Sequence, residues 1–288
     1  MRLALGTVQF GLPYGIANSR GQVSVDDARD IIKRCRGAGI DTIDTAIAYG
    51  DSELCLGQVG VEDFNIVTKI PHIPDSIIDI EEWVISQVTH SIQRLNVKSL
   101  YAVMLHSPDQ LLSGNGIKIL NALYNLRERG LTKKIGFSCY SVDELEGLFE
   151  LGSVDIIQIP FNLVDRRLID SGWLKKLKEK EIEVHTRSSF MQGLLLMPRK
   201  EIPKKFEKWD DIWDKWHDWL ENNSVSSIEA CLSYCLSVTQ IDRVVIGVDT
   251  PSQLDQIISA VNRGGVHSYP NLRSSDIDLL NPTNWNTL

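Results

Sequence analysis

The rest of the chain is organised around one stretch, Asp41-Thr-Ile-Asp-Thr-Ala-Ile-Ala-Tyr-Gly-Asp-Ser-Glu53. It begins with the alternation of apolar and polar residues that is typical of a β-strand, and Gly50 ends the pattern. Asp44 therefore stands at the end of the predicted strand, and Tyr49 stands on the loop beyond it. A carboxylate and a phenol held in this way can serve a proton-transfer site, provided that a cation lowers the pKa of the phenol. Lys69, near the end of the next apolar run, is the candidate cation.

Short apolar segments recur along the whole chain, and helical patterns alternate with them. This alternation predicts a parallel sheet with helices outside it. Eight such segments over about 250 residues favour an α/β fold of the closed (β/α)8 TIM-barrel type over an open doubly wound sheet. No G-x-G-x-x-G motif follows any segment, which argues against a Rossmann domain. The predicted strands cover residues 3–9, 42–46, 64–70, 100–106, 134–138, 154–159, 183–188 and 243–247.

The segments between these strands carry the period and the end signals of helices. We expect one domain over residues 1–288, with 266–288 as an irregular C-terminal tail. The predicted helices cover residues 24–35, 52–59, 80–95, 116–129, 173–180, 206–222, 227–236 and 252–261, and residues 141–144 begin another.

Composition and charge exclude several classes of protein. Apolar residues make up 43% of the 288 residues and charged residues 24%, so the chain can bury a large core. The net charge of -8 opposes binding to phosphate backbones, and nucleic acid is not an expected partner. The five cysteines lack metal-ligand spacing, so we expect reduced, buried thiols. Without a signal segment or an apolar run of about 20 residues, we expect a cytoplasmic protein with no membrane partner, either monomer or homodimer.

Polar side chains interrupt the apolar strands almost only at their carboxyl ends. In a (β/α)8 barrel these ends form one face, and active sites lie there. Each side chain alone also has a structural explanation: Asp44 can cap the next segment, Tyr49 can pack, and His106 can be an ordinary hydrogen-bonded histidine. Lys69 can neutralise Asp44 in an interior ion pair and do nothing more. The residues at this face are Gly6, Thr7, Asp44, Tyr49, Lys69, His106, Ser138, Cys139, Gln158, Asn162, Arg187 and Ser188.

Several motifs resemble those of the aldo-keto reductase superfamily. The run Asp44-Thr-Ala-x-x-Tyr49-Gly50 looks like the signature around that family's acid and its catalytic tyrosine. Val67-Thr-Lys69 resembles its lysine strand, and Leu105-His106-Ser-Pro-Asp109 resembles its histidine strand. The matches follow the family's order from about residue 3 to residue 261. Further similar segments are Ile135-Gly-x-Ser138, Gln158-x-Pro-Phe-Asn162 and Gln192-Gly-Leu-Leu195.

The resemblance implies a barrel enzyme that reduces aldehydes and ketones with NADPH, without metal or flavin. It implies that Tyr49 donates the proton to the developing alkoxide and that Lys69, held by Asp44, lowers the pKa of Tyr49. His106 would orient the carbonyl oxygen. The cofactor-binding residues that it implies are Gly6, Thr7, Ser138, Cys139, Gln158, Arg187, Ser188, Gly193, Gly247, Thr250, Gln253 and Gln256.

Three positions depart from the family pattern. The asparagine usual after the serine of the fifth strand is Cys139, so one hydrogen bond to the nicotinamide carboxamide is lost or remade. The aromatic residue that usually stacks on the nicotinamide is Arg187, whose planar guanidinium can stack or can bind an acidic group of the substrate. The basic residues that commonly bind the 2′-phosphate of NADPH are missing, and Asp249 would repel that phosphate. NADPH is the cofactor expected from the family, with NADH as the alternative.

The sequence determines the carbonyl substrate less well than the reaction. The segment Arg187–Leu196 looks similar to a bacterial subgroup of surface-sugar biosynthesis, which implies a sugar or nucleotide-sugar carbonyl. A second hypothesis is a redox-sensing or regulatory barrel that binds the cofactor with little turnover. A third, a metal-dependent lyase or hydrolase, is disfavoured because no second histidine lies near His106. The Trp-rich segment 209–219 is predicted to be a packing stripe, with a cover over the active-site mouth as the alternative.

Overall fold

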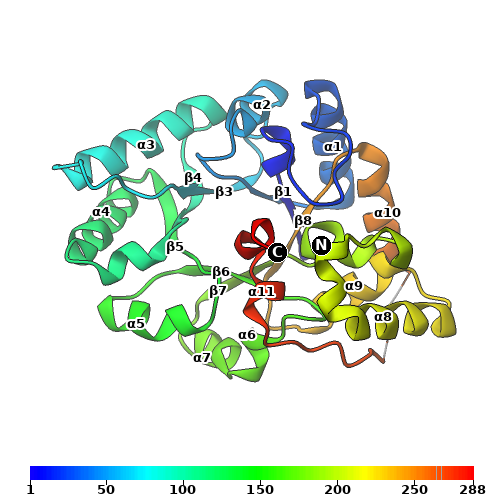
Figure 1. Cartoon of the computed structure of the whole chain (residues 1–288). Helices are drawn as coiled ribbons and strands as arrows, with labels where there is room; N and C mark the ends of the chain where they lie inside the picture. Colours follow the sequence, from blue (N-terminus) through cyan, green and yellow to red (C-terminus); the bar gives the residue numbers. More distant parts are fainter. Residues whose placement is uncertain (264, 267) are drawn as a thin grey trace.

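Eight parallel strands close into a barrel in the computed structural model, which describes residues 1–263, 265, 266 and 268–288 (Figure 1). Each strand pairs with the next along the chain, and the first pairs with the last to close the ring. The predicted (β/α)8 barrel is therefore confirmed. The strands are β1 (Leu3–Gly6), β2 (Thr42–Asp44), β3 (Asn65–Ile70), β4 (Leu100–Leu105), β5 (Thr132–Ser138), β6 (Ile156–Pro160), β7 (Glu183–Arg187) and β8 (Arg243–Gly247).

Helices surround the barrel (Figure 1), and several of them begin at clear capping signals. Ser24 accepts a hydrogen bond from Asp27 N at the start of α1, and Ser226 forms a capping box with Glu229 at the start of α9. The α-helices are α1 (Val25–Ala38), α2 (Ser52–Val59), α3 (Ile80–Leu95), α4 (Gly116–Glu128), α5 (Asp143–Leu151), α6 (Arg167–Asp170), α7 (Trp173–Glu179), α8 (Asp210–Asn223), α9 (Ser227–Ser237), α10 (Pro251–Asn262) and α11 (Ile277–Leu280).

Short 3₁₀ helices lie in the loops and in the C-terminal segment. No helix within the described part of the chain is both long enough and apolar enough to cross a membrane. The 3₁₀ helices are η1 (Val8–Phe10), η2 (Pro108–Leu112), η3 (Met191–Leu196), η4 (Arg199–Glu201), η5 (Lys204–Trp209) and η6 (Pro282–Asn286).

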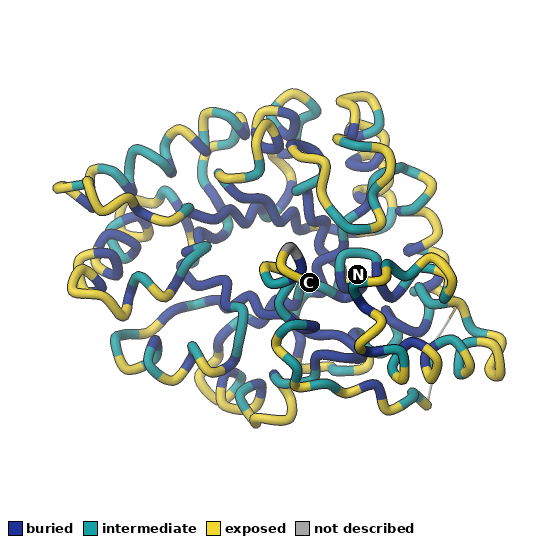
Figure 2. Tube along the Cα trace, in the orientation of Figure 1, coloured by how far each residue is buried: buried dark blue, intermediate teal, exposed yellow. Residues whose placement is uncertain are grey.

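Figure 2 shows that the strands of the barrel are mostly buried, and the apolar core around them has two compartments. The larger one lies between the strands and the surrounding helices. The smaller one is a separate group of fully buried side chains, Val67, Ala102, Met104 and Ile156, from β3, β4 and β6. Lys69 follows Val67 by two positions on β3, so its side chain points to the same side, one layer nearer the carboxyl ends. The apolar group therefore supports a polar layer at that end of the barrel.

Two strands are shorter than the sequence predicted. The strands expected over 3–9 and 42–46 end at Gly6 and Asp44. Thr7 N donates to the backbone oxygen of Asp44 at 3.0 Å as the last link between them, and the chain then turns into η1. The other strand ends differ from the prediction by one or two residues, as the ends of elements commonly do.

The Trp-rich segment is a packing element. The helix expected over 206–222 is two elements, η5 followed by α8. Trp213 and Trp216 on α8 are fully buried and donate from Nε1 to the backbone oxygens of Phe206 and Leu195, each at 3.0 Å. The predicted packing stripe is confirmed, because these rings fill the core and satisfy their only donors there.

The C-terminal segment 266–288 is more regular than the sequence predicted. It contains α11 and η6, and Asp276 caps α11 by accepting a hydrogen bond from Asp278 N. Pro282 and Thr283 reach the main cavity of the barrel. His267, within the predicted tail, lies outside the described residues.

Candidate active site

A carboxylate, an ammonium and an amide meet at the carboxyl ends of β2, β3 and β6. Lys69 Nζ donates to Asp44 Oδ1 at 2.7 Å and to the backbone oxygen of Thr45 at 3.0 Å. Gln158 Nε2 donates to the other carboxylate oxygen, Asp44 Oδ2, at 2.6 Å, and Ser138 Oγ donates to Gln158 Oε1 at 3.3 Å. The Lys69 and Asp44 side chains are 1% and 6% exposed, so water does not separate them. Burial lowers the pKa of Lys69, and the charge of Asp44 opposes that shift.

Tyr49 and His106 lie beside this buried pair. Their rings are 5.8 Å apart between centres and meet edge to face at 78°. Lys69 Nζ lies 5.4 Å from the centre of the Tyr49 ring. Residues from the loop after β2, from β3 and from the position after β4 are thus brought together, as the sequence analysis expected for Asp44, Tyr49, Lys69 and His106.

The turn that carries Tyr49 packs directly on the loop after β1. Gly50 has a φ of +53°, a left-handed conformation that favours glycine. A Cβ atom on Gly11 would lie 1.7 Å from the backbone oxygen of Tyr49 and 2.5 Å from the backbone nitrogen of Ser52. No side chain fits at Gly11 without moving this turn, so the contact between the two loops fixes the position of the phenol.

The pKa of Tyr49 is raised in the structure, whereas the sequence predicted that it would be lowered. Burial is the main cause, the charge of Asp44 adds to it, and Arg187 opposes it. The expected effect of Lys69 fails because its ammonium is held by the Asp44 carboxylate, whose negative charge compensates it. The phenol therefore keeps its proton at neutral pH. Burial, with the charges of Lys69 and Arg187, lowers the pKa of His106 to about 4, so its imidazole is neutral at the same pH.

Another wall of the cavity presents backbone rather than side chains. Gly6 and Gly247 pair with each other across β1 and β8. A Cβ atom on Gly247 would lie 2.6 Å from Gln9 Nε2, and one on Gly6 would lie 3.0 Å from a methyl group of Val245. Gln9 Oε1 is buried without a hydrogen-bond partner among the described residues. Bare backbone beside an unsatisfied amide oxygen fits the close approach of a flat polar ligand such as a nicotinamide nucleotide.

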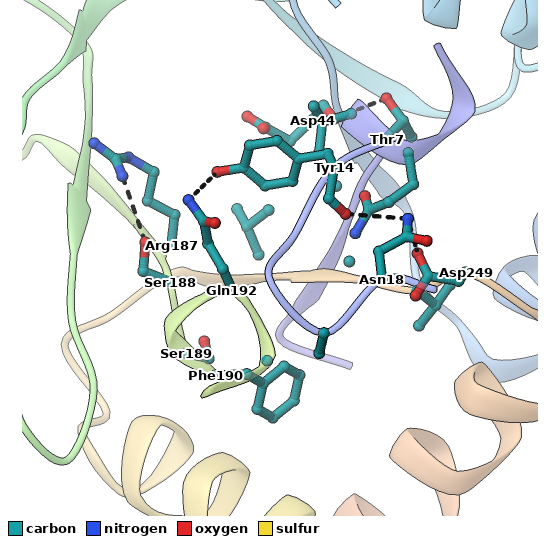
Figure 3. Close-up of a pocket in the computed structure, with 18 of the residues that line it drawn as sticks. Thr7, Tyr14, Asn18, Asp44, Arg187, Ser188, Ser189, Phe190, Gln192 and Asp249 are labelled. Atoms are coloured by element: carbon teal, nitrogen blue, oxygen red, sulfur yellow. Dashed lines mark hydrogen bonds between the residues drawn. The ribbon is translucent and has the colours of Figure 1, made fainter. Parts of the chain in front are cut away.

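The part of the cavity after β8 carries the acidic residue Asp249, in the region where the resemblance led us to look for basic residues. Asp249 accepts a hydrogen bond from Asn18 Nδ2 at 3.2 Å, and its backbone nitrogen donates to Gln253 Oε1 at 2.6 Å (Figure 3). Burial raises the pKa of Asp249, while Gln253 and the charge of Arg20 oppose the shift. Thr250 accepts a hydrogen bond from Gln253 N and caps α10, so its hydroxyl serves the helix.

Arg187 ends β7 and is fixed by its neighbours. Its Cζ atom lies 4.6 Å from the centre of the Tyr140 ring, and its Nη2 donates to the backbone oxygen of Cys139 at 3.1 Å. Cys139 itself is fully buried and does not line the main cavity. Ser188 follows with a φ of +63°, and Asn162 Nδ2 donates to its backbone oxygen at 3.0 Å, which holds this strained turn in place.

One cavity of about 770 Å³ connects these groups, a volume in the range of small-molecule and cofactor sites. Lys69, Cys139 and Thr250 do not line it. The predicted site residues that do line it are Gly6, Thr7, Asp44, Tyr49, His106, Ser138, Gln158, Arg187, Ser188, Gly193, Gly247, Gln253 and Gln256.

Sequence reasoning missed several other residues that line this cavity. Gln192 Nε2 donates to the hydroxyl of Tyr14 at 2.9 Å, which joins the loop after β7 to the loop after β1 (Figure 3). Tyr140 directly follows Cys139 at the carboxyl end of β5. The rule that loops at this end of a barrel carry function could have identified Tyr14 and Tyr140. Gln192 has a φ of +54°, a backbone conformation that its residue type does not reveal.

Comparisons with known proteins show the family of the chain. A model of the aldo/keto reductase family matches residues 2–266 of the chain. L-galactose dehydrogenase of Arabidopsis thaliana is 26% identical over 90% of this chain and 85% of that enzyme. The NADH-specific methylglyoxal reductase of Escherichia coli (strain K12) is 23% identical over 91% of this chain and 90% of that enzyme. The holo form of aldo-keto reductase AKR11C1 from Bacillus halodurans shares the fold, with a TM-score of 0.73, 19% identity and coverage of 92% of this chain and 88% of that one.

Proposed function

Because this chain belongs to the aldo/keto reductase family, we propose that its main cavity reduces the carbonyl group of a small molecule with a reduced nicotinamide cofactor, and that Tyr49 is the proton donor. Carbonyl reduction with NAD(P)H is the reaction of the family. The observation that carries the assignment of residues is the meeting of Asp44, Lys69, Tyr49 and His106 at the carboxyl ends of three neighbouring strands.

The reaction adds one hydride to the carbonyl carbon and one proton to the carbonyl oxygen, which gives the alcohol. The bound cofactor supplies the hydride. Tyr49 donates the proton from its hydroxyl, which is protonated at neutral pH. His106, neutral because its pKa is about 4, orients the carbonyl oxygen through a hydrogen bond. Asp44 holds the Lys69 ammonium 5.4 Å from the centre of the Tyr49 ring, and this buried pair positions the phenol.

Ser138 and Gln158, which the resemblance implied for the nicotinamide carboxamide, would hold that end of the cofactor. The hydroxyl of Ser138 is hydrogen-bonded to the amide of Gln158, and this amide is hydrogen-bonded to Asp44. Gly6 and Gly247 provide backbone that a ring or a ribose can approach closely, and the unpaired Gln9 Oε1 offers an acceptor. Holding the cofactor in this way would fix its reactive carbon relative to the proton donor.

The cofactor expected from the family is NADPH, but Asp249 supports NADH. A carboxylate accepts a hydrogen bond from a ribose 2′-hydroxyl and repels a 2′-phosphate. A similar enzyme, the reductase of Escherichia coli, is NADH-specific by name. We expect kcat/KM for NADH to exceed that for NADPH by about tenfold, and Asp249→Ser to narrow that ratio. Asp255→Ser, at an exposed position on α10, is the matched control for the lost charge.

The substrate that we propose is a keto- or aldehydo-sugar, free or nucleotide-linked, of surface-glycan biosynthesis. Its support is the resemblance of segment 187–196 and the similarity to an enzyme named for the sugar L-galactose. A panel of aldehydes and sugar carbonyls, followed by the absorbance of the reduced cofactor, compares these compounds directly. Equal activity on sugar and non-sugar carbonyls would contradict the sugar assignment.

The Tyr49→Phe variant tests the proton donor. We expect kcat to fall by about 10²- to 10⁴-fold, the usual contribution of a positioned acid, while the cofactor still binds. Tyr124→Phe is the matched control, because its hydroxyl contacts only the backbone oxygen of Ser153 on the outside of the barrel. Turnover that survives unchanged in Tyr49→Phe would refute the assignment, and cofactor binding without reduction of any carbonyl would favour the regulatory alternative.

A further inference from the structure

Arg187 is a cation that the protein holds in a defined position at the cavity. Its guanidinium lies over the Tyr140 ring at 4.6 Å, donates to the backbone oxygen of Cys139 at 3.1 Å and contacts Ser188 Oγ at 3.4 Å. The backbone of Arg187 is also fixed, because Phe161 N donates to its carbonyl oxygen at 3.0 Å. The side chain is partly buried and lines the cavity shared with Tyr49 and His106.

No carboxylate pairs with this guanidinium among the described residues. Two acids of this region, Asp44 at the same cavity and Glu144 beside it, already accept hydrogen bonds from other groups. Asp44 binds Lys69 and Gln158 with its two oxygens. Glu144 accepts the backbone N–H groups of Tyr140 and Ser141 with Oε1, at 3.0 and 2.8 Å. Arg187 therefore has no direct carboxylate partner among the described residues, at the cavity of a chain whose net charge is -8.

The guanidinium also has hydrogen-bond donors to spare. An arginine carries five N–H donors, and the contacts with Cys139 and Ser188 use two of them. A partly buried cation is favourable only with a counter-charge or with water, and a planar fork with free donors matches a carboxylate or a phosphate in both charge and geometry. This arrangement is typical of a group that binds an anionic ligand.

Arg187 also acts electrostatically on the residues proposed to carry out the reaction. Its positive charge opposes the rise in the pKa of Tyr49 and of Tyr14 and contributes to the low pKa of His106. All four side chains line one cavity of about 770 Å³. A small ligand can therefore contact Arg187 with one end while its other end reaches Tyr49 and His106.

We propose that Arg187 selects substrates that carry a carboxylate or a phosphate a few bonds from the carbonyl group, and that it binds this anion directly. The proposal rests on the carbonyl reduction proposed above and specifies the substrate class of the same cavity. It also assigns Arg187 to the substrate, in place of the stacking on the nicotinamide that the resemblance offered as the other role.

Matched pairs of substrates test the proposal. The pairs are 4-oxobutanoate with its neutral amide 4-oxobutanamide, and glyceraldehyde 3-phosphate with glyceraldehyde, so that the two kinds of anion are compared separately. The wild-type protein should favour at least one anionic member in kcat/KM by about tenfold or more, as expected for a charge-assisted hydrogen bond. Preference in the first pair assigns a carboxylate, and preference in the second assigns a phosphate.

Arg187→Gln removes the charge, and Arg187→Lys keeps it but removes the planar fork. We expect the anionic-to-neutral ratio of kcat/KM to fall by roughly 10- to 100-fold in Arg187→Gln and by less in Arg187→Lys. Arg129→Gln is the matched control for net charge. Arg129 follows α4 just before β5 begins, so it lies at the opposite end of the barrel, and its side chain is exposed. This control should leave the ratio unchanged.

A binding measurement separates failure of the inference from failure of the proposed function. Butanoate, which has the carboxylate but no aldehyde, is titrated calorimetrically into protein that holds oxidised cofactor. Binding that is lost in Arg187→Gln supports the anion site even if no carbonyl is reduced, in which case the reductase proposal fails alone. Turnover with an anionic-to-neutral ratio near one in both pairs would overturn the inference and leave the reductase intact. A ratio that Arg187→Gln does not change, with weaker binding of NADH only, would overturn it in favour of stacking on the cofactor.

Discussion

Replacing Lys69 with methionine would leave Asp44 without a counter-charge inside the barrel. In the native protein the two side chains are 1% and 6% exposed, and Nζ lies 2.7 Å from Oδ1. Methionine fills a similar volume, so the variant loses the charge rather than the packing. Gln158 would still donate to Asp44, but one neutral donor does not compensate a buried carboxylate. Removing one partner of a buried pair costs about 3–5 kcal/mol, a large part of a total stability of about 5–15 kcal/mol.

Urea unfolding at pH 7, followed by circular dichroism, measures this cost. The double variant Asp44→Asn with Lys69→Met should be more stable than Lys69→Met alone, because it removes the unpaired charge. Lys175→Met is the matched control, since its pair with Glu179 is 80% and 63% exposed, and it should change the free energy of unfolding by less than about 1 kcal/mol. A Lys69→Met protein within about 1 kcal/mol of the wild type would refute the reasoning, as would a double variant less stable than the single one.

Three further predictions concern the same site. The pKa of His106 is about 4 when folded and near 6.5 when unfolded, so the unfolded chain binds the proton first and the wild type loses stability as pH falls from about 6.5 towards 4. His106→Gln should remove about 2 kcal/mol of that loss, measured as the difference in urea stability between pH 7 and pH 4.5. Gly247→Val should weaken cofactor binding at least tenfold in fluorescence titrations, because the new side chain fills space at the cavity. The melting temperature should change little, since a Cβ at this position would lie 2.6 Å from the flexible end of Gln9. Gly11→Ala should destabilise the fold by more than about 2 kcal/mol in urea, since its Cβ would lie 1.7 Å from the backbone oxygen of Tyr49.

The architecture could be predicted because it depends on repeated local patterns. Eight apolar segments, each followed by a helical pattern, leave few alternatives to a closed parallel barrel, and capping residues such as Ser24 mark where helices begin. The end of β1 could not be predicted in the same way. Leu3 to Gln9 reads as one short apolar strand, and only the turn that packs against the Tyr49 loop ends it at Gly6.

The residues of the site could be predicted better than their pKa values. The carboxyl-end rule gathered Asp44, Tyr49, Lys69 and His106 from separate strands, because parallel strands bring these ends to one face. The sequence suggested that Lys69 pairs with Asp44, but it does not show how far the carboxylate cancels the effect of the ammonium on the pKa of Tyr49. Contacts between loops, such as the one from Gln192 to Tyr14, depend on backbone conformations that residue types leave open.

The carboxylate of Asp44 has a consequence for how this protein can change during evolution. One oxygen holds the lysine beside the phenol, and the other holds the amide of Gln158 at the proposed cofactor side. A substitution that improved one of these partnerships would disturb the other, so natural selection cannot adjust the two halves of the site separately. Among related sequences we therefore expect positions 44, 69 and 158 to be retained together or replaced together, while the rim positions around them vary independently.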